Sequence, residues 1–308
     1  ERFDTHFKWQ NIIMSVGAGG ALNVTMKTII DPEDEVIVFA PYFSEYDLYI
    51  QNYDGKIVIV SPNTADFQPN LQEFESKITG KTKAVIVNTP NNPSGAVYSK
   101  ETIIAITDIL KAKQKEYQKE IYLISDEPYR ELLYDGAVHT FVTNYYANSF
   151  VCYSYSKSLS LPGERIGYVA IADEMADSAT VLRGLQTSTR IMGFVNAPSL
   201  IQKGVKACIK EMTDIAYYDR NRKTLYEGLL GMGFECVKPQ GAFYLFLKSP
   251  ESDEAAFCEK AKNYNLMLVR GSAFSCPGYV RITYCNSLDK IERSLPQFEK
   301  LAQEYGLK

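Results

Sequence analysis

A lysine in an unusual setting gives the strongest chemical signal in the sequence. Lys157 stands in SYSKSLSLPGERIGY (154–168), in a predicted turn after an apolar strand, with Ser154 and Ser156 before it and Arg165 eight residues after it. Hydroxyls and a guanidinium are good phosphate ligands, and burial beside cations lowers the pKa of an amine and frees it as a nucleophile and base. A lone lysine is by default a surface residue, but this setting favours one that forms a Schiff base with a phosphorylated aldehyde cofactor.

Asp126 and Asn92 are polar residues expected at the ends of two other apolar runs. Asp126, in SDEPYREL (125–132), would be a carboxylate deep in a sheet, where its charge is costly unless it meets a cation or a strong donor. A protonated pyridine nitrogen is such a partner, and the capping of a helix is the plainer alternative. Asn92, in NTPNNPSG (88–95), either belongs to a tight loop or aims its amide at a ligand oxygen.

A glycine-rich turn near the N-terminus offers a candidate anion site. In SVGAGGAL (15–22), Gly17, Ala18 and Gly19 precede a helical pattern. Their backbone N–H groups would point outward from the N-terminus of that helix, where an anion is favoured. Taken alone, such a turn is more often structural.

The elements that must position these residues alternate between β-rich runs and helical patterns. The runs are near-continuously apolar, are bounded by Gly, Pro, Asn or Asp, and cover 36–41, 56–62, 83–90, 121–129, 149–158 and 165–172. Strands buried on both faces have this composition. The sequence therefore predicts an α/β fold whose mainly parallel, mixed sheet carries helices on both faces. Ligands bind beyond the carboxyl ends of such strands, so the polar segments should converge.

The pattern changes near residue 210, which predicts two domains. Residues 1–210 form the predicted large domain, and residues 211–308 form a smaller C-terminal α+β domain. The smaller domain has a long helical segment, a helix over 253–263, strand-like runs LMLVRG and YVRITYC, and a C-terminal helix from about residue 288.

Composition and charge exclude several classes of function. The net charge is −4 over 308 residues and no basic run suggests nucleic-acid binding. No apolar stretch approaches the ~20 residues of a membrane span, and the N-terminus does not resemble a signal peptide. The six cysteines form no CxxC pair and there are two histidines, which argues against a metal site and favours free thiols. We expect a cytoplasmic protein.

The segments NNPSG, SDEPY and SYSKSLSLPGERIG, in this order, resemble those of the fold-type I, class I/II aminotransferases, which are similar to aspartate aminotransferase and use pyridoxal 5′-phosphate. The resemblance covers essentially the whole chain and makes residues 1–210 the cofactor-binding domain. It implies that Lys157 forms the Schiff base and shuttles the substrate proton, and that Asp126 pairs with the pyridinium N1. Asn92 and Tyr129 would bind the phenolic O3′, and Phe43, in APYFSEY, would stack on the ring, although a core role is the alternative.

The same resemblance assigns the anionic groups of cofactor and substrate. The phosphate would be held by the glycine-rich turn and the following side chains, namely Gly17, Ala18, Gly19, Ser154, Ser156 and Arg165. Arg281, in GYVRITYCNS, would grip the substrate α-carboxylate as a bidentate partner. Arg190 would reach across a homodimer to a side-chain carboxylate, or is a plain surface or interface arginine. VKPQGAFYLF (237–246) matches a small-domain signature that we interpret as structural.

The expected activity is amino-group transfer from an L-amino acid, with aspartate favoured, to a 2-oxo acid, with 2-oxoglutarate favoured. A carbon–sulfur lyase on the same scaffold and a non-catalytic regulator that senses the cofactor are the alternatives. Members of this family normally carry a longer N-terminal stretch before the glycine-rich turn. Here about sixteen residues precede Gly17, so we expect the chain to be a fragment.

Overall fold

A seven-stranded mixed sheet forms the centre of the molecule, in a computed structural model that describes residues 3, 5 and 7–307. Its strand order is β1-β7-β6-β5-β4-β2-β3. The strands are β1 (Ile12–Ser15), β2 (Glu35–Phe39), β3 (Lys56–Val60), β4 (Thr82–Asn88), β5 (Tyr122–Asp126), β6 (Ser149–Ser154) and β7 (Gly167–Ile171). Strands β2 to β6 pair in parallel, whereas β7 is antiparallel to both β6 and β1. The predicted α/β class and all six predicted strands are confirmed, and β1 is an additional strand.

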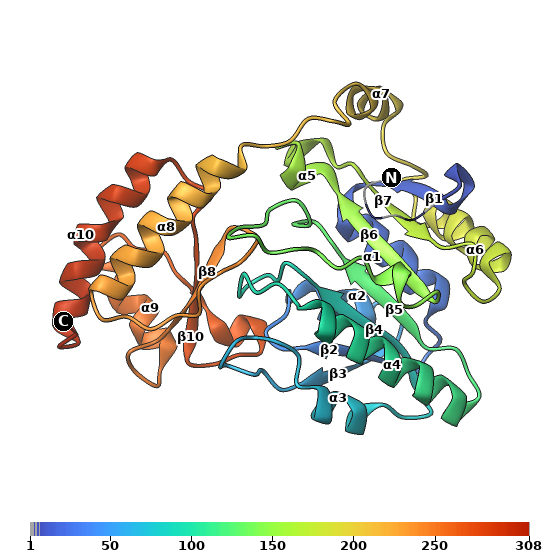
Figure 1. Ribbon diagram of the computed structural model, residues 1–308, viewed down its shortest axis with the longest axis horizontal. Coiled ribbons are helices and arrows are strands. Elements are labelled where there is room, and N and C mark those ends of the chain that lie inside the picture. The colour runs from blue at the N-terminus through green and yellow to red at the C-terminus, as the bar shows by residue number, and fades with distance from the viewer. Residues whose placement is uncertain (1–2, 4, 6, 308) are drawn as a thin grey trace.

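Helices cover both faces of this sheet (Figure 1). One face packs against α1 (Gly17–Ile29), α2 (Glu45–Gln51) and α6 (Ser178–Ile191), and the other packs against α3 (Leu71–Lys77) and α4 (Lys100–Tyr117). Along β2, Val36 and Val38 enter the first core whereas Ile37 and Phe39 enter the second. Alternate side chains of a strand point to opposite faces, so a strand buried on both faces is apolar throughout.

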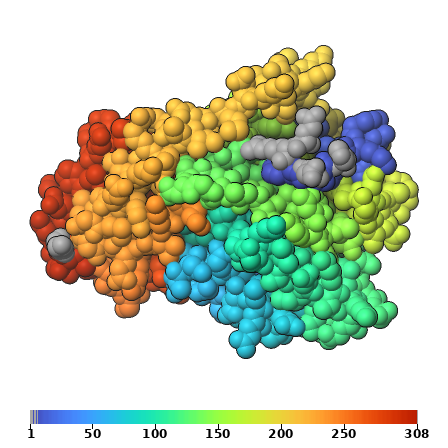
Figure 2. All heavy atoms as spheres, in the orientation of Figure 1, coloured from blue at the N-terminus to red at the C-terminus, as the bar shows by residue number. Residues whose placement is uncertain are grey.

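A smaller lobe stands at one end of the molecule (orange to red in Figures 1 and 2). It contains a three-stranded antiparallel sheet of order β8-β10-β9, made of β8 (Tyr244–Lys248), β9 (Val269–Arg270) and β10 (Tyr279–Thr283). Helices α8 (Ile215–Gly231), α9 (Glu254–Lys262) and α10 (Leu288–Glu304) share one core with this sheet. The smaller C-terminal α+β domain is therefore confirmed, although residues 129–134 of the preceding chain also contribute to its core.

Two short helices and four 3₁₀ turns complete the part of the chain that the structure describes. These are α5 (Tyr155–Ser158), α7 (Ser199–Ala207), and 3₁₀ turns at Trp9–Asn11, Val142–Asn144, Pro162–Glu164 and Gly271–Phe274. In Figure 2, α7 (gold) protrudes from the surface of the molecule. Within the described residues, no helix has the length and apolar composition needed to cross a bilayer.

Arg222 on α8 joins two stretches of chain beside the smaller lobe's core. Its side chain is fully buried, donates to the carbonyl of Pro239 at 2.9 Å, and pairs with Asp219 at 2.6 Å and Asp135 at 2.9 Å. A buried guanidinium is tolerated where its N–H groups find partners, and here it has carboxylates from two segments.

The strand ends bring polar residues to one edge of the larger sheet. Strands β4, β5 and β6 run in the same direction and end at Asn88, Asp126 and Ser154. Because β7 runs in the opposite direction, it begins where the others end, and Arg165 just before it enters at the same edge. The reversed strand explains why a residue that precedes a strand joins residues that follow strands.

Candidate active site

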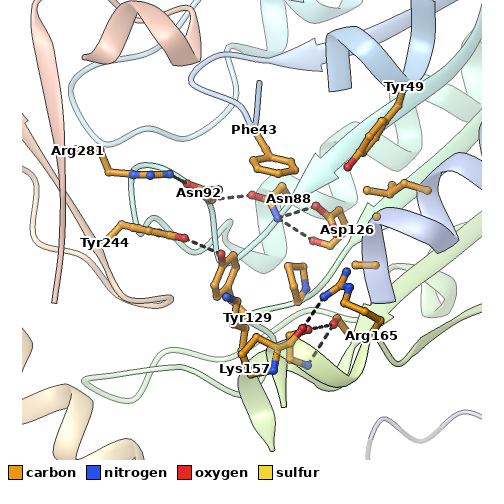
Figure 3. A pocket seen from close by; sticks show the side chains of 17 residues that line it. Phe43, Tyr49, Asn88, Asn92, Asp126, Tyr129, Lys157, Arg165, Tyr244 and Arg281 are labelled. Atoms are coloured by element: carbon orange, nitrogen blue, oxygen red, sulfur yellow. Dashed lines mark hydrogen bonds between the residues drawn. The ribbon is translucent and has the colours of Figure 1, made fainter. Parts of the chain in front are cut away.

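A pocket of about 350 Å³ lies at this edge of the larger sheet, between the two sheets. It is lined by eleven of the predicted site residues: Ala18, Gly19, Phe43, Asn92, Asp126, Tyr129, Ser154, Ser156, Lys157, Arg165 and Arg281. Figure 3 shows Arg281 and Tyr244 on one side of the pocket and Asp126 and Arg165 on the other. Its lining contains three cationic side chains and one carboxylate, which suits a ligand with several negative charges.

Asp126 presents a buried carboxylate with one oxygen bonded and one oxygen free. Its Oδ2 accepts a hydrogen bond from the Tyr46 hydroxyl at 2.5 Å, and the Asn88 amide lies 3.5 Å away. Its Oδ1 is buried and has no hydrogen-bond partner within the described part of the chain. Burial raises the pKa of Asp126 to about 7, against the lowering effect of the Tyr46 bond. Turns follow Asp126, so the helix-capping alternative does not hold.

Lys157 lies in the short helix α5 rather than in the predicted turn. Helix α5 begins after Ser154, whose side chain accepts the Ser156 N–H at 3.1 Å. The Lys157 ammonium is half-buried and lies 4.9 Å from the ring centre of Phe243. Burial lowers the pKa of Lys157, and the Arg165 cation lowers it further against an opposing effect of Cys285. A larger share of this amine is therefore unprotonated and nucleophilic than for a surface lysine.

The glycine-rich turn and Arg165 form one wall of the pocket. Helix α1 begins at Gly17, whose φ is +85°, and a Cβ at this position would lie 2.6 Å from Arg165 Nη2. Arg165 donates to the carbonyls of Pro162 at 2.8 Å and Val16 at 3.3 Å. Both a left-handed φ and close approach of a guanidinium require glycine here. The helix N-terminus, the serine hydroxyls and Arg165 together form a cup for a phosphate.

Arg281 extends into the pocket from β10 and is held on three sides. Its Nη1 donates to Asn92 Oδ1 at 2.9 Å. Its guanidinium lies 4.5 Å from the ring centre of Tyr244 and 4.7 Å from that of Phe274. Stacked rings fix the plane of a guanidinium, so Arg281 presents a defined edge to a carboxylate.

Tyr129 and Phe43 occupy the walls between these groups. The Tyr129 hydroxyl is buried and lies 2.9 Å from the hydroxyl of Tyr244. Phe43 is half-buried and packs edge-on against Tyr46 at 5.7 Å. One flat face of a ligand ring would find an aromatic neighbour in Phe43.

Gly17 adjoins Arg165 without lining the pocket, and Arg190 is the predicted site residue that lies away from the pocket. It lies exposed on α6 and lines a separate hollow with residues of β1 and with Asn196. Its suggested role requires a second copy of the chain and stays a prediction.

Three residues near the pocket's chemistry were missed by the sequence reasoning. Asn88 ends β4, accepts the Asn92 N–H at 2.8 Å on its Oδ1 and donates to the Asp126 carbonyl at 2.9 Å. Tyr46 bonds Asp126, and Tyr244 belongs to the segment interpreted as structural but lines the pocket. The position of Asn88 at a strand end could have identified it. Nothing in the sequence separates the two tyrosines from core aromatics.

Comparison with known proteins identifies the family. Residues 3–295 match the family "Aminotransferase class I and II". The aspartate aminotransferase of Thermotoga maritima is 32% identical over 97% of this chain and 77% of its own length. The aspartate/prephenate aminotransferase of Thermus thermophilus is 31% identical over 95% of this chain and 75% of its own length. A solved amino transferase from Eubacterium rectale has a TM-score of 0.97 and 46% identity, over 99% of this chain and 77% of that chain.

The chain belongs to the class I and II aminotransferases, a family of enzymes that depend on pyridoxal phosphate. The residues present fit that cofactor. The buried Asp126 Oδ1, which no described residue hydrogen-bonds, is the acceptor that a pyridinium N–H requires. Lys157 lines the same pocket as Ala18, Gly19, Ser154, Ser156 and Arg165 of the phosphate cup.

Proposed function

We propose that this chain is a pyridoxal-phosphate-dependent aminotransferase in which Lys157 binds the cofactor covalently. It would transfer the amino group of an L-amino acid, with aspartate favoured, to a 2-oxo acid, with 2-oxoglutarate favoured. The observation that carries the proposal is the convergence on one pocket of Lys157, Arg281 and the buried Asp126 Oδ1, which has no hydrogen-bond partner among the described residues.

Each residue has a separate task in this proposal. When bound, the cofactor supplies an aldehyde that captures amines and a protonated ring that draws electrons from the substrate Cα. Asp126 Oδ1 would accept the ring N–H and keep it protonated, because a buried carboxylate is stabilised by an adjacent cation. Asn92 and Tyr129 would orient the phenolic oxygen, and Phe43 would cover one ring face.

The remaining residues would bind the cofactor phosphate and the substrate. The phosphate would accept hydrogen bonds from the backbone of the glycine-rich turn, from Ser154 and Ser156, and from Arg165. Arg281 would pair with the α-carboxylate and place the substrate Cα–H within reach of Lys157 Nζ. That amine, with its lowered pKa, would then take the Cα proton as a general base.

The preference for aspartate is supported by the names of the relatives, several of which are aspartate aminotransferases. Arg190 is the candidate for the substrate's side-chain carboxylate, and its exposure on α6 leaves it accessible to a partner chain. We accordingly propose a homodimer. We also propose a cytoplasmic location and a domain boundary that separates residues 1–210 from 211–308, just before α8 begins.

The experiment is an absorbance spectrum of the purified chain with pyridoxal phosphate, taken before and after addition of L-aspartate. The expected result is a visible band that collapses as the amino group is transferred, with oxaloacetate appearing in equal amount. Lys157→Ala should abolish both the band and the transfer. Substantial transfer by Lys157→Ala would overturn the proposal, and pyruvate with ammonia from a cystathionine-type substrate would indicate a carbon–sulfur lyase.

A further inference from the structure

Tyr244 touches both the cofactor side and the substrate side of the pocket. It is the first residue of β8, beside β10, which carries Arg281. Its hydroxyl lies 2.9 Å from that of Tyr129, and its ring centre lies 4.5 Å from the Arg281 guanidinium. The Tyr244 side chain is buried and lines the pocket. One side chain is therefore in contact with two residues whose proposed ligands are different.

The contact with Tyr129 constrains where each hydroxyl hydrogen points. Either hydroxyl can be the donor in this pair, and each carries one hydrogen. If Tyr129 donates to the phenolic oxygen of a cofactor, it has no hydrogen left for Tyr244. Tyr244 must then donate to Tyr129. A hydroxyl that accepts one hydrogen bond becomes a stronger donor of another, by roughly 10–30%.

The contact with Arg281 depends on the ring and not on the hydroxyl. The guanidinium lies 4.5 Å from the ring centre of Tyr244 and 4.7 Å from that of Phe274, and it donates to Asn92. A phenylalanine in place of Tyr244 would retain the ring and lose the hydroxyl. The two contacts can therefore be removed one at a time.

We propose that Tyr244 is a positioning residue that acts through two neighbours: its hydroxyl directs the Tyr129 O–H toward the cofactor's phenolic oxygen, and its ring holds Arg281 for the substrate carboxylate. The inference rests on the proposed function. It assigns a role in cofactor tuning to a residue of the smaller sheet, whereas Asp126 ends a strand of the larger one and Lys157 and Arg165 lie in the segment that joins two of its strands.

A spectroscopic titration of the cofactor-loaded protein tests the hydroxyl. The pKa of the visible band reports the proton shared between Lys157 Nζ and the phenolic oxygen, and a good Tyr129 donor lowers this pKa by stabilising the oxygen's negative charge. Tyr244→Phe weakens that donor, so we expect the band pKa to rise by about 0.2 to 0.7. Tyr146→Phe is the matched control, because it removes another buried hydroxyl, bonded to the carbonyl of Ile121 and away from the pocket.

The apparent Kd for L-aspartate, measured from the collapse of the same band, tests the ring. Tyr244→Phe should leave this Kd within about twofold, whereas Tyr244→Leu should raise it by about threefold or more, as expected for loss of one cation–π contact. An unchanged band pKa in Tyr244→Phe, or an equal shift in Tyr146→Phe, would overturn the assignment. A wild-type protein with no visible band would instead refute the proposed function itself, together with the role that rests on it.

Discussion

Replacing Asp126 with asparagine should stabilise the cofactor-free protein at pH 8. The pKa of Asp126 is raised from 3.8 to about 7 in the folded chain, mainly by burial. Its contribution to stability is fully present below pH 3.8, and it is lost as the pH rises toward 7, because the unfolded chain ionises first. Three pH units at 1.36 kcal/mol each give a cost of ~4 kcal/mol for the charged side chain. The new amide would leave an N–H unpaired at the position of Oδ1, which costs ~1–3 kcal/mol.

The net expectation is a stabilisation of ~1–3 kcal/mol at pH 8, or about 2 to 5 °C in Tm for a chain of this size. Thermal unfolding at pH 8 and pH 4, followed by circular dichroism, measures it, and at pH 4 the gain should turn into a loss, because little charge cost then offsets the unpaired amide N–H. Asp135→Asn is a control of opposite sign, since its partners Arg222 and Lys238 lower the pKa of Asp135 to about 2. This control should lose stability at pH 8. If the Asp126→Asn protein is no more stable than wild type at pH 8, the reasoning that burial makes the ionised carboxylate costly is refuted.

The same substitution should damage activity while leaving the phosphate cup intact. Removing one partner of a buried ion pair costs ~3–5 kcal/mol, so Asp126→Asn should slow amino-group transfer by about 10²- to 10⁴-fold. Stopped-flow decay of the visible band with L-aspartate measures this rate. A rate within fivefold of wild type, at full cofactor content, would contradict the proposed pairing of Asp126 with the ring nitrogen.

Two further substitutions test the phosphate cup and the smaller lobe. Gly17→Ala should weaken cofactor binding about tenfold or more in an equilibrium titration, because its Cβ would displace Arg165. Gly136→Ala is its control: φ is +76° there too, but a Cβ would meet nothing within 4 Å, so cofactor affinity should be unchanged. Arg222→Met should lower the free energy of unfolding of the smaller lobe by ~2–3 kcal/mol, since it removes charge-assisted hydrogen bonds while Asp135 and Asp219 keep Lys238 and Lys223 as partners. Denaturant unfolding with a loss below 1 kcal/mol would show that these contacts contribute little.

The strand pattern was predictable because burial on both faces makes a strand apolar throughout. The six predicted runs became strands β2 to β7. The four residues of β1, IIMS, form too short a run to distinguish from a loop or the start of a helix. The direction of β7 could not be predicted either. A short turn would make it antiparallel to the preceding strand and a longer crossover would make it parallel, and the apolar run itself is the same in both cases.

The site was predictable where polar residues interrupt an apolar context. Asp126 and Lys157 stand out for that reason, whereas the hydroxyls of Tyr46 and Tyr244 find their partners only after packing. An aromatic residue in an apolar segment has the composition of a core residue, whichever way its hydroxyl points. The role of Arg190 cannot be tested by the structure of one chain, since that proposed role depends on a partner chain.

The placement of the cationic groups on two different sheets has a consequence for the shape of a substrate. Lys157 is fixed to the larger sheet by α5, whereas Arg281 is fixed to the smaller sheet by β10. The spacing between the sheets therefore sets the number of bonds between the amino group and the carboxylate of any molecule held by both. We expect β- and γ-amino acids, whose carboxylates lie one and two carbons farther away, to fit poorly. The spacing between the two sheets would then select α-amino acids as substrates.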